Sequence, residues 1–103
     1  HIGAINSGGI TTAIIGSGLD IIYPKENIKL YYNIIENNGL IATEYPLGTN
    51  PKPSNFPARN RIISGISKGV IVIEASKKSG ALITADFALE QGRNVYAIPR
   101  KYK

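Results

Sequence analysis

The sequence predicts an α/β fold, with an open, mostly parallel sheet and helices on both of its faces. Short apolar segments rich in β-branched residues alternate along the chain with segments of helical periodicity. Strands that are joined by helical crossovers lie parallel, and right-handed connections place the helices on the faces of the sheet. The 103 residues show no repeat and no low-complexity tract, which indicates one domain or part of one.

The first half of the chain is expected to contribute two strands and the helix between them. An apolar run over residues 10–15 predicts the first strand, and the residues before it look like the end of a helix. Residues 25–38 follow Pro24, carry apolar side chains at helical spacing and precede Gly39, which is typical of the left-handed residue after a helix. Residues 40–45 predict the second strand.

The second half is expected to repeat this alternation after a proline-rich loop. Residues 46–56 contain three prolines, which exclude helix and central strand, and loops of this length are often functional. A second helix is predicted from Pro57, as its first residue, to about Lys68. The remaining elements are a buried strand, a helix and a last strand, over residues 70–73, 80–91 and 94–99.

Composition limits the possible functions. The chain has no cysteine, so thiolate metal sites and disulfides are excluded, and a single histidine, His1, argues against a histidine-based metal cluster or catalytic triad. No apolar run is as long as a membrane span. The absence of methionine predicts a piece of a longer protein, with N-terminal elements of the fold missing. The formal net charge of +5 favours an anionic partner.

Positive charge gathers where open α/β sheets bind ligands, outside the carboxyl ends of the strands. Most of the lysines and arginines follow a predicted strand or lie at the start of the next helix, which predicts an anion site, although loops that only aid solubility are the alternative. These residues are Lys52, Arg59, Arg61, Lys77, Lys78, Arg100, Lys101 and Lys103.

The first motif able to hold a phosphate is the glycine turn after the first strand, formed by Gly16, Ser17 and Gly18. Glycines allow backbone N–H groups to approach a phosphate closely. A tight turn without a ligand is the alternative, because the G-x-G-x-x-G fingerprint of dinucleotide sites would need glycine in place of Ile21.

The second motif opens the last predicted helix and comprises Lys77, Lys78, Ser79 and Gly80. A helix N-terminus offers unpaired N–H donors and a partial positive charge, which suit an anion, and the two lysines add to both. The alternative is that Ser79 only caps the helix.

The third motif lies at the start of the second helix and comprises Phe56, Arg59, Asn60 and Arg61. Phe56, on the adjoining loop, could stack on a base beside cationic side chains, as in single-stranded nucleic-acid sites, or could be a core residue that anchors the loop. Arg59 and Arg61 diverge on a helix, so only one of them is expected to face a given ligand.

These motifs together resemble the DNA-processing protein A family (DprA, also called Smf). The segments GSGLDIIYPKEN, ATEYPLG and NFPARNRIISGISKGVIVIEASKKSGALITADFALEQGRNVYAIP occur in the family's order and spacing. The resemblance covers nearly the whole chain. It implies that residues 1–103 are part of an extended Rossmann-like domain that binds single-stranded DNA without sequence preference.

The resemblance further implies a non-catalytic, cytoplasmic role in DNA uptake and natural transformation, in which the protein protects incoming strands and helps to load the RecA recombinase. It implies a homodimer for the full-length protein and no cofactor, metal or membrane partner. Lys52 lies about one residue from the register of a DNA-contacting lysine in some members. Carried over residue by residue, the DNA pocket comprises Gly16, Ser17, Gly18, Phe56, Arg59, Asn60, Arg61, Ser79 and Gly80.

Two other functions remain open. A nucleotide-hydrolysing enzyme similar to the Rossmann-like phosphoribohydrolases would release free base, with Glu74 as its carboxylate, but the P-G-G-x-G-T-x-x-E run of those enzymes is absent. A nucleotide-sensing or scaffold domain would bind mononucleotides that oligonucleotides do not displace.

Overall fold

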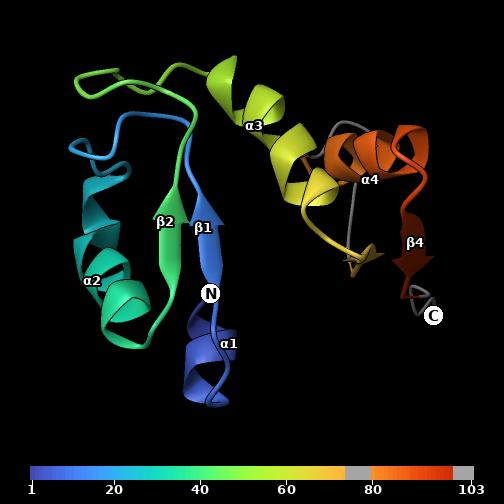
Figure 1. Ribbon diagram of the computed structural model, residues 1–103, viewed down its shortest axis with the longest axis horizontal. Helices are drawn as coiled ribbons and strands as arrows, with labels where there is room; N and C mark the ends of the chain where they lie inside the picture. The colour runs from blue at the N-terminus through green and yellow to red at the C-terminus, as the bar shows by residue number, and fades with distance from the viewer. Residues whose placement is uncertain (74–79, 99–103) are drawn as a thin grey trace, which may run out of the picture. The chain divides into compact units, whose positions relative to one another are not determined.

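A computed structural model of the chain describes residues 1–73 and 80–98. Strands and helices alternate along it, which confirms the predicted α/β class (Figure 1). No helix in this described part is long and apolar enough to cross a bilayer. The elements are α1 Ile2–Asn6, β1 Thr12–Ile14, the 3₁₀ turn η1 Lys25–Asn27, α2 Ile28–Glu36, β2 Leu40–Ala42, α3 Asn55–Gly65, β3 Gly69–Val72, α4 Gly80–Glu90 and β4 Asn94–Ala97.

The strands in residues 1–73 and 80–98 form two parallel pairs. β1 pairs with β2, with Thr12 opposite Leu40, and β3 pairs with β4, with Gly69 opposite Asn94. Each pair belongs to a different compact unit of the chain, an N-terminal unit over residues 1–56 and a C-terminal unit over residues 57–103. Within each unit a helix connects the paired strands, as the parallel order requires.

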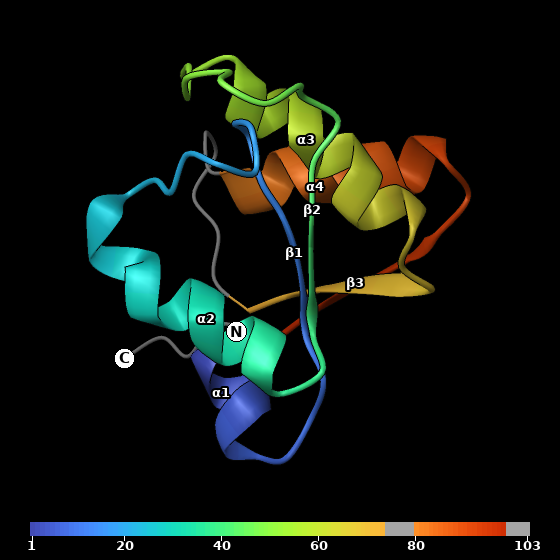
Figure 2. The ribbon, with the colours of Figure 1, turned by 60° about the vertical axis from the view of Figure 1, so that its left-hand side comes forward.

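The core of the N-terminal unit forms where α2 packs on the β1–β2 pair (Figure 2). Ile34, only 1% exposed, lies against Ala13 and Ile15. Leu30 and Tyr31 stand three or four residues before Ile34, so they share its helix face and pack at the edge of the same core. The apolar face predicted from the helical spacing is therefore only partly buried: Tyr31 and Ile34 belong to the core, whereas Ile28 and Ile35 are 48% and 54% exposed.

The helix after the proline-rich loop begins earlier than predicted. α3 starts at Asn55, so Phe56 lies in its first turn and not on the loop, and Pro57 is its third residue and not its first. Proline is tolerated there because the first N–H groups of a helix have no acceptor within the helix. Asn55 starts the helix because its amide Nδ2 donates to the Gly16 carbonyl at 2.9 Å and its backbone N–H donates to the Lys52 carbonyl.

The end of α2 also differs from the prediction, because Asn38, with φ of 63°, and not Gly39 adopts the left-handed conformation. The Asn38 and Gly39 amides donate to the carbonyls of Ile35 and Ile34, the two bonds of a Schellman motif. Gly39 is needed for a different reason. A Cβ there would lie 2.6 Å from the Ile34 carbonyl oxygen and closer still to that of Thr11.

In the C-terminal unit α4 packs against both β3 and β4. Small residues, Ala85 and Ala88, are its buried positions and allow this close approach. The predicted stop at Gly92 is confirmed, since Gly92 has φ of 75° and the Arg93 amide donates to the Ala88 carbonyl at 2.8 Å.

We expect Gly39→Ala to lower the free energy of unfolding by roughly 1–3 kcal/mol, because the added methyl group collides with backbone and the end of α2 must shift. Urea unfolding followed by circular dichroism measures this. Gly3→Ala is the matched control, since a Cβ at Gly3 meets nothing within 4 Å. Equal stability of the two variants would contradict the packing described for Gly39.

Candidate functional site

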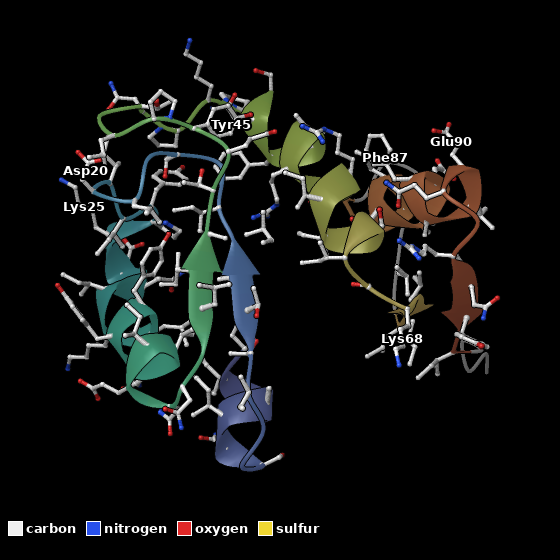
Figure 3. The ribbon with its side chains drawn as sticks, viewed as in Figure 1. Asp20, Lys25, Tyr45, Lys68, Phe87 and Glu90 are labelled. Atoms are coloured by element: carbon white, nitrogen blue, oxygen red, sulfur yellow. The ribbon has the colours of Figure 1, made fainter. Side chains whose placement is uncertain are left out.

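In the N-terminal unit, the loops that leave β1 and β2 lie together beyond the carboxyl ends of these strands. Figure 3 shows Asp20 on the first loop and Tyr45 on the second, both at this edge. Open α/β sheets bind ligands at this edge, so the placement agrees with the sequence-based expectation.

The glycine turn after β1 is buried and bonded within the chain. Ser17, 2% exposed, donates its hydroxyl to the Ile21 carbonyl at 3.0 Å, and its own carbonyl accepts from the Thr43 hydroxyl at 2.8 Å. The Gly18 amide donates to the Thr49 carbonyl at 3.0 Å. These contacts are those of a tight turn, the alternative stated above, and phosphate binding by Gly16, Ser17 and Gly18 stays a prediction.

The two loops touch at Gly18. A Cβ there would lie 2.6 Å from the Pro46 carbonyl oxygen and 2.8 Å from Oδ1 of Asp20. The same Asp20 carboxylate accepts a 2.8 Å hydrogen bond from the Gly48 amide. Glycine at position 18 is therefore required by the close approach of the second loop.

We did not predict from the sequence that Asp20 and Thr43 hold the two loops together at this edge. The Thr43 hydroxyl donates to Ser17 and accepts from the Tyr45 amide at 3.1 Å, so it bonds to both loops. The position of these two residues after a strand could have indicated such a role. Their partners, however, lie more than twenty residues away in the sequence, so the contacts could not be predicted from local sequence.

Phe56 packs on the glycine turn from the start of α3. A Cβ on Gly16 would lie 3.2 Å from two atoms of the Phe56 ring, which leaves room for glycine alone without movement. The ring is half-buried, and its centroid lies 6.0 Å from that of Tyr23 at an interplanar angle of 38°. Phe56 therefore holds the glycine turn in place, and it also forms an aromatic pair with Tyr23 beyond the carboxyl end of β1.

Lys52, another of the predicted site residues, is exposed on the loop just before α3.

In the C-terminal unit a buried amide joins α3 to the start of α4. Asn60, 8% exposed, accepts a 2.9 Å hydrogen bond from Nε of Arg59 and directs its own Nδ2 at the Gly80 carbonyl, 3.4 Å away. The structure therefore brings three of the predicted site residues together: Arg59, Asn60 and Gly80.

The N-terminus of α4 is uncrowded at Gly80 and carries the partial positive charge of a helix end. Among the described residues the nearest atom to a Cβ on Gly80 would be Nδ2 of Asn60 at 3.8 Å, so nothing crowds this position. Neither α3 nor α4 carries an acidic residue in its first turn, so no carboxylate on these turns competes with a bound anion. Lys77, Lys78 and Ser79 of the same motif lie outside the described residues.

Arg61 lies on α3 two residues after Arg59. Its side chain is exposed while that of Arg59 is half-buried, as expected for residues two apart on a helix. Its backbone carbonyl accepts from Nε2 of Gln91 at 2.9 Å, and Oε1 of Gln91 accepts from the fully buried Ser64 hydroxyl. Gln91 thereby ties the end of α4 to α3. The described residues contain no group of three or more acidic or histidine side chains placed to hold a metal.

Comparison with known proteins identifies relatives of this chain. The family model of the DNA recombination-mediator protein A matches residues 1–103. DNA processing protein DprA of Streptococcus pneumoniae is 52% identical over 99 residues, which are 96% of this chain and 35% of that protein. Protein Smf of Escherichia coli is 48% identical over 96% of this chain and 26% of its own length. The chain thus spans about a quarter to a third of these relatives.

Two solved structures share the fold. The crystal structure of DNA processing protein A from Streptococcus pneumoniae superposes with a TM-score of 0.86 and 47% identity over 98% of this chain and 35% of its own. DNA processing protein A from Helicobacter pylori, whose structure is described as showing a single-stranded DNA binding mode, superposes with a TM-score of 0.80 and 32% identity, over 87% of this chain and 41% of its own.

We expect Thr43→Val to cost about 1–3 kcal/mol of stability, because it leaves the Ser17 carbonyl and the Tyr45 amide without their hydroxyl partner. Thr43→Ser keeps the hydroxyl and should lose much less. Thr12→Val, on an exposed strand position, is a control expected to stay within about 0.5 kcal/mol. The midpoints of urea unfolding rank the stabilities of the variants. Equal midpoints for Thr43→Ser and Thr43→Val would show that the hydroxyl does not account for the stability.

Proposed function

Because the chain belongs to the DNA recombination-mediator protein A family, we propose that its 103 residues form part of one domain that binds single-stranded DNA without catalysis. The structure of the Helicobacter pylori relative concerns its binding of single-stranded DNA, which supports single-stranded DNA as the ligand. The net charge of +5 suits a polyanion.

The grouping of Arg59, Asn60 and Gly80 is the observation that carries the proposal. A guanidinium group and the N-terminus of a helix are both strong ligands of phosphate oxygens. The hydrogen bond from Arg59 to Asn60 orients the guanidinium before DNA binds, which reduces the entropy lost on binding. In this proposal Lys77, Lys78 and Ser79 extend the phosphate contacts along the same segment, and Arg61 contacts the strand from the exposed side of α3.

The N-terminal unit contributes its own contacts in this proposal. Lys52 meets a phosphate, and Phe56 borders the bases from the first turn of α3. Gly16, Ser17 and Gly18 act chiefly by holding Phe56 and the second loop in place, since their contacts are with protein atoms. Binding is then largely independent of sequence, because phosphate contacts carry no sequence information.

We extend the proposal to the whole protein by family membership. It acts in the cytoplasm, as a homodimer, in DNA uptake and natural transformation, where it protects incoming strands and helps to load RecA. The relatives from Streptococcus pneumoniae and Bacillus subtilis, both named DNA processing protein DprA and 52% and 46% identical to this chain, support the DNA-processing role.

Fluorescence anisotropy of a labelled oligo-dT strand, its duplex and a mononucleotide competitor tests the proposal. We expect the single strand to bind more tightly than the duplex, with log K falling by about 2.8 per tenfold increase in salt if about four phosphates are neutralised. Mononucleotide binding that oligo-dT cannot displace would favour the sensing alternative. Release of free base would favour the enzyme.

We expect Arg59→Ala to weaken oligo-dT binding about tenfold and to reduce the salt slope by about 0.7, the share of one phosphate on a single strand. Lys29→Ala, which removes one exposed charge from α2, is the matched control and should change neither quantity appreciably. If Arg59→Ala and Arg61→Ala both leave affinity and slope at the wild-type values, the site is wrongly assigned.

Asn60→Ala separates orientation from charge. The variant keeps Arg59 but removes the acceptor of its Nε and the link to Gly80, so we expect weaker oligo-dT binding with an unchanged salt slope. Circular dichroism and urea unfolding must first show that the variant folds, since Asn60 is buried. A changed slope with unchanged affinity would argue against the orienting role.

A further inference from the structure

Tyr23 is a large aromatic side chain that is exposed beyond the carboxyl end of β1 in the N-terminal unit. It lies on the loop between β1 and η1, beyond the carboxyl end of β1, and is 54% exposed. Lys25, exposed two residues later, lies on the same segment in Figure 3. Exposure alone would not distinguish Tyr23, because Tyr32 on α2 is 56% exposed.

Tyr23 differs from Tyr32 in what supports its ring. Its centroid lies 6.0 Å from that of Phe56 in a tilted arrangement, a separation at which aromatic rings attract each other. Phe56 is itself held against Gly16, and Asn55 beside it is bonded to the Gly16 carbonyl. The exposed ring of Tyr23 is therefore backed by a second ring that the glycine turn fixes in place.

Hydrogen bonds hold the part of the loop between β1 and η1 that precedes Tyr23. Ser17 bonds to Ile21 near its start, and the Asp20 carboxylate bonds to the Gly48 amide of the neighbouring loop. Fewer loop conformations are then lost when a ligand binds to the ring. An exposed, supported aromatic face beside an exposed lysine is the combination with which proteins bind the bases of a single strand.

We propose that Tyr23 is a stacking platform for a nucleobase, with Lys25 placed for the adjoining phosphate. Every base offers a flat π face, so such a contact adds affinity without sequence preference. This inference rests on the proposed function and deepens it: it assigns base stacking to Tyr23, while Phe56 chiefly supports the Tyr23 ring from behind.

The first experiment uses the absence of tryptophan from the chain. Tyr23→Trp introduces a single indole, whose emission should be quenched when oligo-dT is added. Tyr32→Trp, at an equally exposed site on α2, is the matched control and should keep its emission at the same DNA occupancy. Equal quenching at both sites, or none at position 23 while anisotropy shows binding, would overturn the proposal.

The second experiment separates base from phosphate. Tyr23→Ala should weaken oligo-dT binding roughly 5- to 150-fold, the range for loss of one stacked base, and should leave binding of an abasic strand of the same length unchanged. Tyr23→Phe should bind like the wild type, and Tyr32→Ala should bind both strands normally.

The outcomes distinguish this inference from the proposed function. If the wild-type chain binds oligo-dT and Tyr23→Ala binds it equally well, Tyr23 does not stack and the proposed function stands. An equal loss for oligo-dT and the abasic strand would mean that Tyr23 only maintains the loop, which also overturns the inference. If the wild-type chain binds no oligo-dT, the proposed function fails and the inference fails with it.

Discussion

The hydrogen bond from the Thr43 hydroxyl to the Ser17 carbonyl, 2.8 Å long, is the constraint on which the candidate site of the N-terminal unit depends. Backbone groups that a parallel pair leaves beyond its last ladder bond must find partners elsewhere when they are buried. Thr43 supplies one, and across the same gap the Gly18 amide donates to the Thr49 carbonyl while the Gly48 amide donates to the Asp20 carboxylate. The two loops therefore behave as one cross-linked layer.

The aromatic pair depends on that layer. Because the glycine turn is held from the second loop, Gly16 presents a fixed surface to Phe56, and Phe56 in turn supports Tyr23. In the C-terminal unit, Asn60 has a comparable role, since its buried amide joins Arg59 to the start of α4. In both units, buried polar groups with satisfied hydrogen bonds position the exposed groups that we propose to meet DNA.

Local signals predicted the order of elements well and their limits less well. The helix end at Gly92 was predicted because a left-handed residue there favours glycine. The start of α3 was not predicted correctly, because proline is acceptable at several positions in the first turn of a helix. In addition, the hydrogen-bond partner of Asn55, the Gly16 carbonyl, comes from a distant segment of the chain. Asn38 took the left-handed position expected of Gly39, and Gly39 is required instead because a Cβ there would collide with the carbonyl oxygens of Thr11 and Ile34.

The sequence by itself determined the α/β class, the parallel pairing of strands, the family and the candidate cationic residues, since periodicity, helix-end residues and motif spacing are local properties. Only the tertiary structure decided that Gly18 is needed for a loop contact, that Asp20 and Thr43 join the two loops, and that Arg59 is held through Asn60 to Gly80. These contacts join atoms from segments remote in the chain, and their geometry exists only once α2 and α4 have packed on their strand pairs.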